Sequence, residues 1–105
     1  MQLNEYQELS ARTASNKLEP DQVLINWALG LAGEVGEYVE LIKKRQFHGK
    51  AIDQDAVRKE LGDILWYLAQ SASEWGFTLD EIANANLEKL AKRYPDGFKR
   101  QDAKP

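Results

Sequence analysis

The sequence predicts an all-α fold, an antiparallel four-helix bundle-like unit that assembles as a homo-oligomer. Apolar residues recur at steps of three and four over long stretches, which places them on one face of a helix. Proline, glycine and capping residues interrupt this pattern, and short connections between long helices favour antiparallel neighbours. A 105-residue chain has a small core, and its three tryptophans and Phe77 present more apolar surface than one copy can bury.

The first two helices are predicted over residues 4–17 and 22–46. The apolar markers of the first helix are Tyr6, Leu9 and Leu18. Pro20 and Asp21 signal the start of the second helix, with Asp21 as its N-cap. The core side of the second helix is formed by Leu24, Ala28, Leu31, Val35, Tyr38 and Ile42.

The third helix follows a break at residues 48–50. It is capped by Asp53 or Asp55, runs to about Trp75, and is closed by Gly76. Its core side is formed by Val57, Leu61, Ile64, Leu65, Leu68 and Ala72.

The fourth helix begins at Thr78 and ends near Tyr94. Glu81 follows Thr78 by three residues, which is the spacing of a capping box. We therefore expect a single domain over residues 1–105, with a flexible tail at about 96–105.

Composition narrows the class of protein. With 43% hydrophobic and 30% charged residues, the chain is typical of a globular domain. No apolar run approaches the roughly 18 residues of a membrane span, and no secretion signal is visible. The absence of cysteine removes disulfides, zinc–thiolate sites and cysteine nucleophiles. A chain without cysteine is expected in the reducing cytoplasm. Because the net charge is −3, we expect it to bind neither nucleic acid polymers nor membranes.

Two carboxylate pairs of equal spacing lie in the middle of the second and third predicted helices, beside the apolar face. They are Glu34-x-x-Glu37 and Glu60-x-x-Asp63. If the helices pack antiparallel, the four acids meet, and desolvated carboxylates cannot share a pocket as bare anions. A divalent cation resolves that conflict, and Mg²⁺ prefers oxygen ligands. The pairs therefore predict a metal-dependent enzyme acting on phosphates; the alternative is a solvated face with salt bridges.

The neighbours of the acid pairs bear on this interpretation. Gly30 precedes Glu34 by four residues and should clear space beside the acids, whereas Gly33 and Gly36 are explained by close helix packing. A ferritin-like di-iron site would need Glu-x-x-His pairs, and the single histidine, His48, falls in a predicted loop. We therefore do not expect iron.

The last predicted helix carries a basic face. Asn86, Lys89 and Arg93 are three and four residues apart, so they share one side of the helix. Such a face could hold a polyphosphate whose other oxygens are bound by metal. The simpler alternative is that cations near a helix C-terminus are favourable through the helix dipole alone.

Three segments carry a resemblance to a known family. They are GLAGEVGEYVELIKK, KELGDILWYLA and ANLEKLAKRYPDGF. In their order, separation and flanking residues they resemble the MazG-like all-α nucleoside triphosphate pyrophosphohydrolases over about residues 22–98. Relatives in that family include dCTP pyrophosphatases and dimeric dUTPases. The resemblance implies a unit of about four helices that forms a homodimer or homotetramer. It also implies Mg²⁺-dependent cleavage of nucleoside triphosphates to the monophosphate and pyrophosphate, with Mn²⁺ as a substitute.

The same resemblance implies roles for individual residues. The metal ligands are Glu34, Glu37, Glu60 and Asp63. The substrate-binding residues are Asn26, Tyr67, Lys89 and Arg93. Among these, Asn26 corresponds to a contact with the base, and Lys89 and Arg93 to the basic residues of the last helix.

The predicted mechanism uses one or two Mg²⁺ ions on the acids, with Glu37 or Glu34 as general base on a water. Trp27, Trp66 or Tyr67 could stack on the base, although a core or interface position explains the tryptophans equally well. The implied role is nucleotide-pool housecleaning. Two alternatives stay open, a phosphoribosyl-ATP pyrophosphohydrolase-like enzyme and a non-catalytic helical interaction protein.

Overall fold

The computed structural model describes residues 1–15, 17–49 and 51–97. The helices are α1 (Leu3–Ser10), the short 3₁₀ turn η1 (Ala11–Thr13), α2 (Pro20–His48), α3 (Gln54–Glu74) and α4 (Leu79–Arg93). Within these ranges there is no strand, so the all-α prediction is confirmed. The predicted tail lies, from residue 98 onward, outside the described residues.

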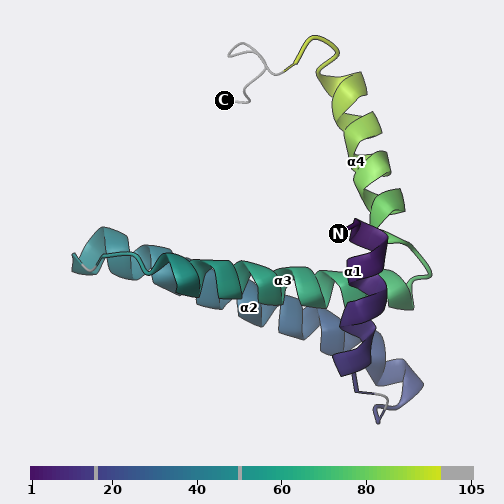
Figure 1. Cartoon of the computed structure of the whole chain (residues 1–105), viewed down its shortest axis with the longest axis horizontal. Helices are drawn as coiled ribbons and strands as arrows, with labels where there is room; N and C mark the ends of the chain where they lie inside the picture. Colours follow the sequence, from purple (N-terminus) through teal and green to yellow (C-terminus); the bar gives the residue numbers. More distant parts are fainter. Residues whose placement is uncertain (16, 50, 98–105) are drawn as a thin grey trace.

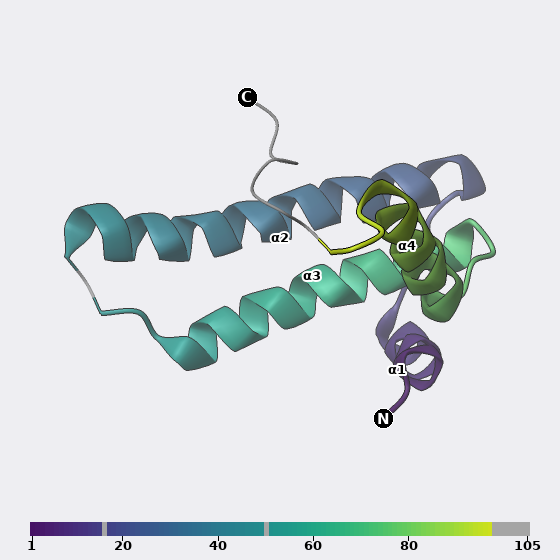
Figure 2. The same cartoon turned by 90° about the horizontal axis from the view of Figure 1, so that it is seen from above.

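The helices form an open arrangement around one antiparallel pair. α2 and α3 lie side by side as a hairpin, and α1 crosses one end of it (Figures 1 and 2). α4 runs away from the hairpin and packs against α1 (Figure 1). The packing of the fourth helix thus differs from an up-down bundle, in which α4 would lie along α2 and α3.

Three of the predicted helix boundaries are confirmed, each with its local cause. The Asp53 side chain accepts hydrogen bonds from the first turn of α3. Gly76 follows α3 with φ +78°, a left-handed conformation that glycine adopts without a steric penalty. Thr78 and Glu81 form the reciprocal capping box of α4.

Two predicted boundaries are wrong. The first helix ends at Ser10 instead of about residue 17, because the hydroxyls of Ser10 and Thr13 bond to carbonyls three residues earlier and the backbone turns extended at Ala14. Asp21 is not the N-cap of α2. Glu19 occupies that position without a side-chain bond, and Pro20, whose fixed φ suits the first turn, begins the helix.

The core of one copy is small. Its buried hydrophobic residues are Trp27, Ala69, Ala72 and Leu79. Among the described residues no large side chain is fully buried, whereas sixteen large hydrophobic side chains are exposed. The radius of gyration is 17.0 Å, against about 13 Å for a compact domain of this length. No helix in the described ranges is long and apolar enough to cross a membrane.

Candidate active site

An acidic cluster forms where α2 and α3 face each other. It consists of Glu34 from α2 and Glu60 and Asp63 from α3, and each offers a carboxylate oxygen within 4.8 Å of the others. Glu34 and Glu60 are half-buried between the helices, and Asp63 is exposed at their edge. The antiparallel hairpin therefore brings together three of the four acids that the spacing singled out.

Glu37, the fourth predicted ligand, is exposed and lies outside this cluster. Three residues turn a helix by about 300°, so Glu37 lies about 60° around α2 from Glu34, on the solvent side. Its negative charge still contributes to raising the pKa of Glu34. Glu37 is thus a neighbour of the cluster rather than one of its members.

The electrostatics of the cluster disfavour three bare anions. The pKa of Glu34 is raised, first because burial desolvates the carboxylate and then because Glu34 shares a hydrogen bond with Glu60. The negative charges of Asp63, Glu60 and Glu37 raise this pKa further. A cation bound among these oxygens would instead favour the charged form of the carboxylates.

An unpartnered oxygen marks the same place. Glu60 Oε2 is buried and has no hydrogen-bond donor among the described residues. Leaving a buried charged acceptor unsatisfied costs about 1–3 kcal/mol or more. All the donor atoms of the cluster are carboxylate oxygens, which suit a hard cation such as Mg²⁺. The residues present therefore fit the metal that the sequence predicts.

An aromatic cluster lies along the same helix pair. Trp66 stands edge-on to both Trp27 and Tyr67, with ring centroids 5.5 and 5.0 Å apart. Gly30 makes room for Tyr67, because a Cβ at this position would overlap the tyrosine ring. The predicted space beside Gly30 thus exists, and a ring occupies it. Trp27 is buried, as the core explanation predicted, although its Nε1 has no partner among the described residues.

The close packing predicted for Gly33 and Gly36 is not found within one chain. A Cβ at either position would meet no atom within 4 Å beyond its own helix. Both glycines are exposed, because they lie on the side of α2 turned away from α3.

The predicted substrate residues are spread over two helices. Asn26 is exposed on α2, eight residues and so about 12 Å before Glu34 along the helix axis. Tyr67 is half-buried one turn after Asp63 on α3. Lys89 and Arg93 are exposed on α4, which runs away from the hairpin, so this chain does not bring them to its own acids (Figure 1).

Tyr6 is a site neighbour that the sequence suggested only as an apolar marker. It packs from α1 against the core of Ala69, Ala72 and Leu79. The pKa of Tyr6 is raised by burial and then by the negative charge of Asp63, so α1 lies beside the acidic flank of α3. No sequence signal reveals this contact, because it depends on how α1 crosses the hairpin.

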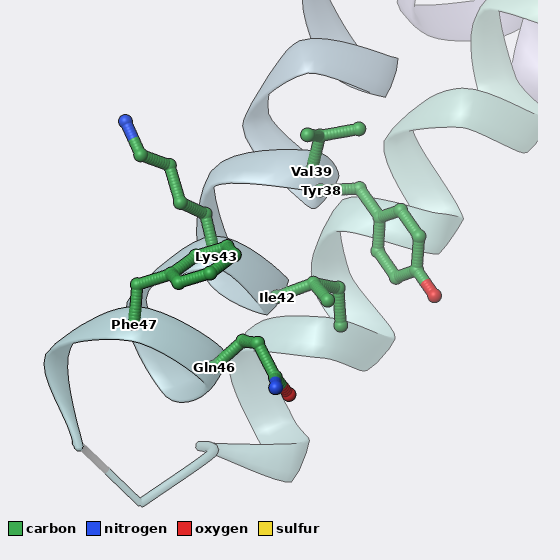
Figure 3. A pocket seen from close by; sticks show the side chains of 6 residues that line it. All are labelled: Tyr38, Val39, Ile42, Lys43, Gln46 and Phe47. Carbon is green, nitrogen blue, oxygen red and sulfur yellow. The ribbon is translucent and has the colours of Figure 1, made fainter.

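One surface hollow is separate from the acids. It is lined by Tyr38, Val39, Ile42, Lys43, Gln46 and Phe47 near the end of α2 (Figure 3). Tyr38 reaches across toward α3 while Lys43 points away from it (Figure 3). The lining is almost wholly apolar and holds no carboxylate, so it offers contact surface and no catalytic group.

The fold and the acidic cluster define an all-α protein with three carboxylates gathered between two antiparallel helices. The chain matches the MazG nucleotide pyrophosphohydrolase domain over residues 22–98, which span α2, α3 and α4, and it belongs to that family. It is 37% identical over 73 residues to the Gene 37 protein of Mycobacterium phage L5. That alignment covers 66% of this chain and 64% of the phage protein, so the chain spans slightly less than two thirds of its relative. No solved structure matches the chain.

Proposed function

We propose that the chain is a Mg²⁺-dependent pyrophosphohydrolase that converts ribo- or deoxyribonucleoside triphosphates to the monophosphate and pyrophosphate. Membership of the MazG family supports the class of reaction. The observation that carries the proposal is the cluster of three carboxylates, in which one buried oxygen has no hydrogen-bond donor from the part of the chain that the structure describes. Such a cluster is stabilised by a cation and destabilised without one.

Glu34, Glu60 and Asp63 would hold the cation, with Glu37 as the fourth predicted ligand. When bound, Mg²⁺ supplies charge neutralisation for the triphosphate and lowers the pKa of a water. Manganese offers a similar preference for oxygen ligands and is the expected substitute.

The general base is proposed to be Glu37, with Glu34 as the second choice. Glu37 is exposed and lies outside the three-acid cluster, so its carboxylate can accept a proton from water. As the water oxygen bonds to phosphorus, its proton passes to the base. The P–O bond of the α,β-bridge breaks with its electron pair on the leaving oxygen.

Substrate binding is proposed for four residues, which are Asn26, Tyr67, Lys89 and Arg93. Tyr67 presents a half-buried ring one turn from Asp63, and stacking of a base on a ring contributes about 1–3 kcal/mol. Asn26 offers amide donors and acceptors to the base. Lys89 and Arg93 offer cationic donors to phosphate oxygens.

The test is pyrophosphate release from standard and modified nucleoside triphosphates, with Mg²⁺ and with EDTA. We expect release that requires Mg²⁺ and falls at least about 100-fold in Glu60→Gln. Glu40→Gln is the matched control, because Glu40 is an exposed acid of α2 outside the cluster. A fully active Glu60→Gln enzyme would refute the assigned site.

The substrate panel also addresses the biological role. We propose housecleaning of the nucleotide pool in the cytoplasm, which predicts a preference for modified bases over standard ones. Phosphoribosyl-ATP belongs in the same panel, since its exclusive cleavage would replace the proposed substrate class.

A further inference from the structure

The aromatic cluster lies to one side of the acids along the hairpin. Trp27 precedes Glu34 on α2 by seven residues, which is about 10 Å along the helix axis, and Tyr67 follows Asp63 on α3 by four. Because α2 and α3 are antiparallel, both displacements run toward the end of the hairpin that α1 crosses (Figures 1 and 2). The rings and the acids therefore follow one another along the hairpin.

The opposite direction leads from the acids to the connection between α2 and α3. Exposed cationic side chains gather there, at the end of α2 and the start of α3; they are Lys43, Lys44, Arg45, Arg58 and Lys59. A nucleoside triphosphate is also linear, with the base at one end, the β- and γ-phosphates at the other, and the cleaved α,β-bridge between them. The hairpin thus presents rings, acids and cations in the order that such a substrate requires.

Among these cations, Lys44 lies on the same side of α2 as the acids. It follows Glu37 by seven residues, which amounts to about 10 Å along the axis and a rotation of only about 20°. Helix side chains tilt toward the N-terminus of their helix, so Lys44 leans back toward Glu37. Lys43 is turned about 120° from Glu37 and lines the apolar hollow, where it points away from α3 (Figure 3).

Lys44 also differs from the cations of α3, because it has no acidic partner among the described residues. Arg58 and Lys59 both pair with Asp55, at 3.3 and 3.2 Å. Glu40 precedes Lys44 by four residues, the spacing at which helix ion pairs form, but these two described side chains are not paired. The ammonium of Lys44 is therefore available to an anion from outside the chain.

We propose that Lys44 binds the β- and γ-phosphates of the substrate, and the pyrophosphate that they become. This assignment rests on the proposed function, because it adds a residue to the same site. The ammonium offers three N–H donors and a positive charge to phosphate oxygens. Lys44 supplies them from α2 itself, whereas Lys89 and Arg93 lie on α4, which runs away from the hairpin (Figure 1).

Comparing Lys44→Ala with Lys43→Ala tests this assignment. The two lysines are adjacent and both exposed, so the variants remove the same charge from two different sides of α2. On the triphosphate that the wild type cleaves fastest, we expect kcat/KM to fall about 10–100-fold in Lys44→Ala, as for the loss of a hydrogen bond to a charged group. The same quantity should stay within about twofold of the wild type in Lys43→Ala.

The two products separate a contact with the outer phosphates from a general loss of binding. Pyrophosphate contains the phosphates assigned to Lys44, and the nucleoside monophosphate does not. As a product inhibitor in Mg²⁺, pyrophosphate should bind Lys44→Ala about 10–100-fold more weakly than the wild type, and the monophosphate should bind both equally. Titration calorimetry of pyrophosphate with Mg²⁺ makes the same comparison without turnover.

Two further variants of Lys44 complete the experiment. Lys44→Arg keeps the charge and should recover most of the affinity for pyrophosphate. Lys44→Gln keeps part of the side-chain stem and replaces the alanine variant if that variant does not give a helical circular dichroism spectrum.

Equal losses in Lys44→Ala and Lys43→Ala would overturn the assignment, since general attraction to the basic end of the hairpin would then explain both. Unchanged affinity of Lys44→Ala for pyrophosphate, or equal weakening of the two products, would also overturn it. Each of these results includes an active wild type and therefore leaves the proposed function standing. A wild type that releases no pyrophosphate from any triphosphate would refute the proposed function itself.

Discussion

Replacing Glu34 by glutamine should stabilise the metal-free protein. The change removes one negative charge from three carboxylates whose oxygens lie within 4.8 Å, and the new amide can donate to Glu60. Two unit charges 4.8 Å apart repel by about 0.9 kcal/mol in water and by about 3.5 kcal/mol at an effective dielectric constant of 20. Because Asp63 is exposed and solvent screens it, we expect a gain of about 1–2 kcal/mol.

The gain depends on pH with a defined sign. The pKa of Glu34 is raised above its ordinary value of 4.5, so the folded state binds this proton more tightly than the unfolded state. That contribution to wild-type stability is complete below pH 4.5 and is lost as pH rises through the folded pKa. The advantage of Glu34→Gln should therefore be small near pH 4 and largest near pH 7.

Thermal unfolding followed by circular dichroism measures this difference. In EDTA near pH 7, a gain of 1–2 kcal/mol raises the melting temperature by about 4–16 °C. Adding Mg²⁺ should raise the melting temperature of the wild type, since a ligand of the folded state stabilises it, and should raise that of Glu34→Gln less. A variant that melts below the wild type in EDTA, near pH 7, would refute the argument that the acids repel one another.

Three further substitutions test the packing that positions the site. Gly30→Ala should destabilise by about 1–3 kcal/mol in urea unfolding, because the added Cβ overlaps the Tyr67 ring. Gln7→Leu should lower the free energy of unfolding in urea by about 1–3 kcal/mol, since it leaves the buried first amide of α4 without its acceptor. Asp53→Ala should cost about 1 kcal/mol, measured as a lower melting temperature, through loss of the α3 cap.

Each of these substitutions has a control on the same helix. Gly33→Ala meets open space and should stabilise by about 0.5–1 kcal/mol, so a loss equal to that of Gly30→Ala would contradict the Tyr67 contact. Glu8→Leu changes an exposed neighbour of Gln7 and should leave stability nearly unchanged. Gln54→Ala alters the residue after Asp53 and leaves the hydrogen bonds of the Asp53 cap in place. If Gln54→Ala lowered the melting temperature as much as Asp53→Ala, the effect of Asp53→Ala could not be assigned to the cap.

Some helix boundaries could be predicted from the sequence because interactions between neighbouring residues determine them. The Asp53 cap, the left-handed Gly76 and the Thr78–Glu81 box depend on residues within one turn of each other, so sequence spacing predicts them. The end of α1 at Ser10 escaped prediction. At this end of α1 the side-chain hydroxyls of Ser10 and Thr13 bond to backbone carbonyls, and these bonds outweigh the weak helical pattern of the following residues. Hydrophobic spacing carries no information about such bonds.

What the sequence determined by itself was the all-helical class and the spacing that lets Glu34 meet Glu60 and Asp63, since these follow from local periodicity and residue type. The sequence also determined the family, through the resemblance of three of its segments to known members. The tertiary structure alone decided what depends on the angle between helices. It left Glu37 on the solvent side of the cluster, seated Tyr67 against Gly30, and turned α4 away from the hairpin. Those outcomes rest on contacts between distant segments, whose geometry no single helix specifies.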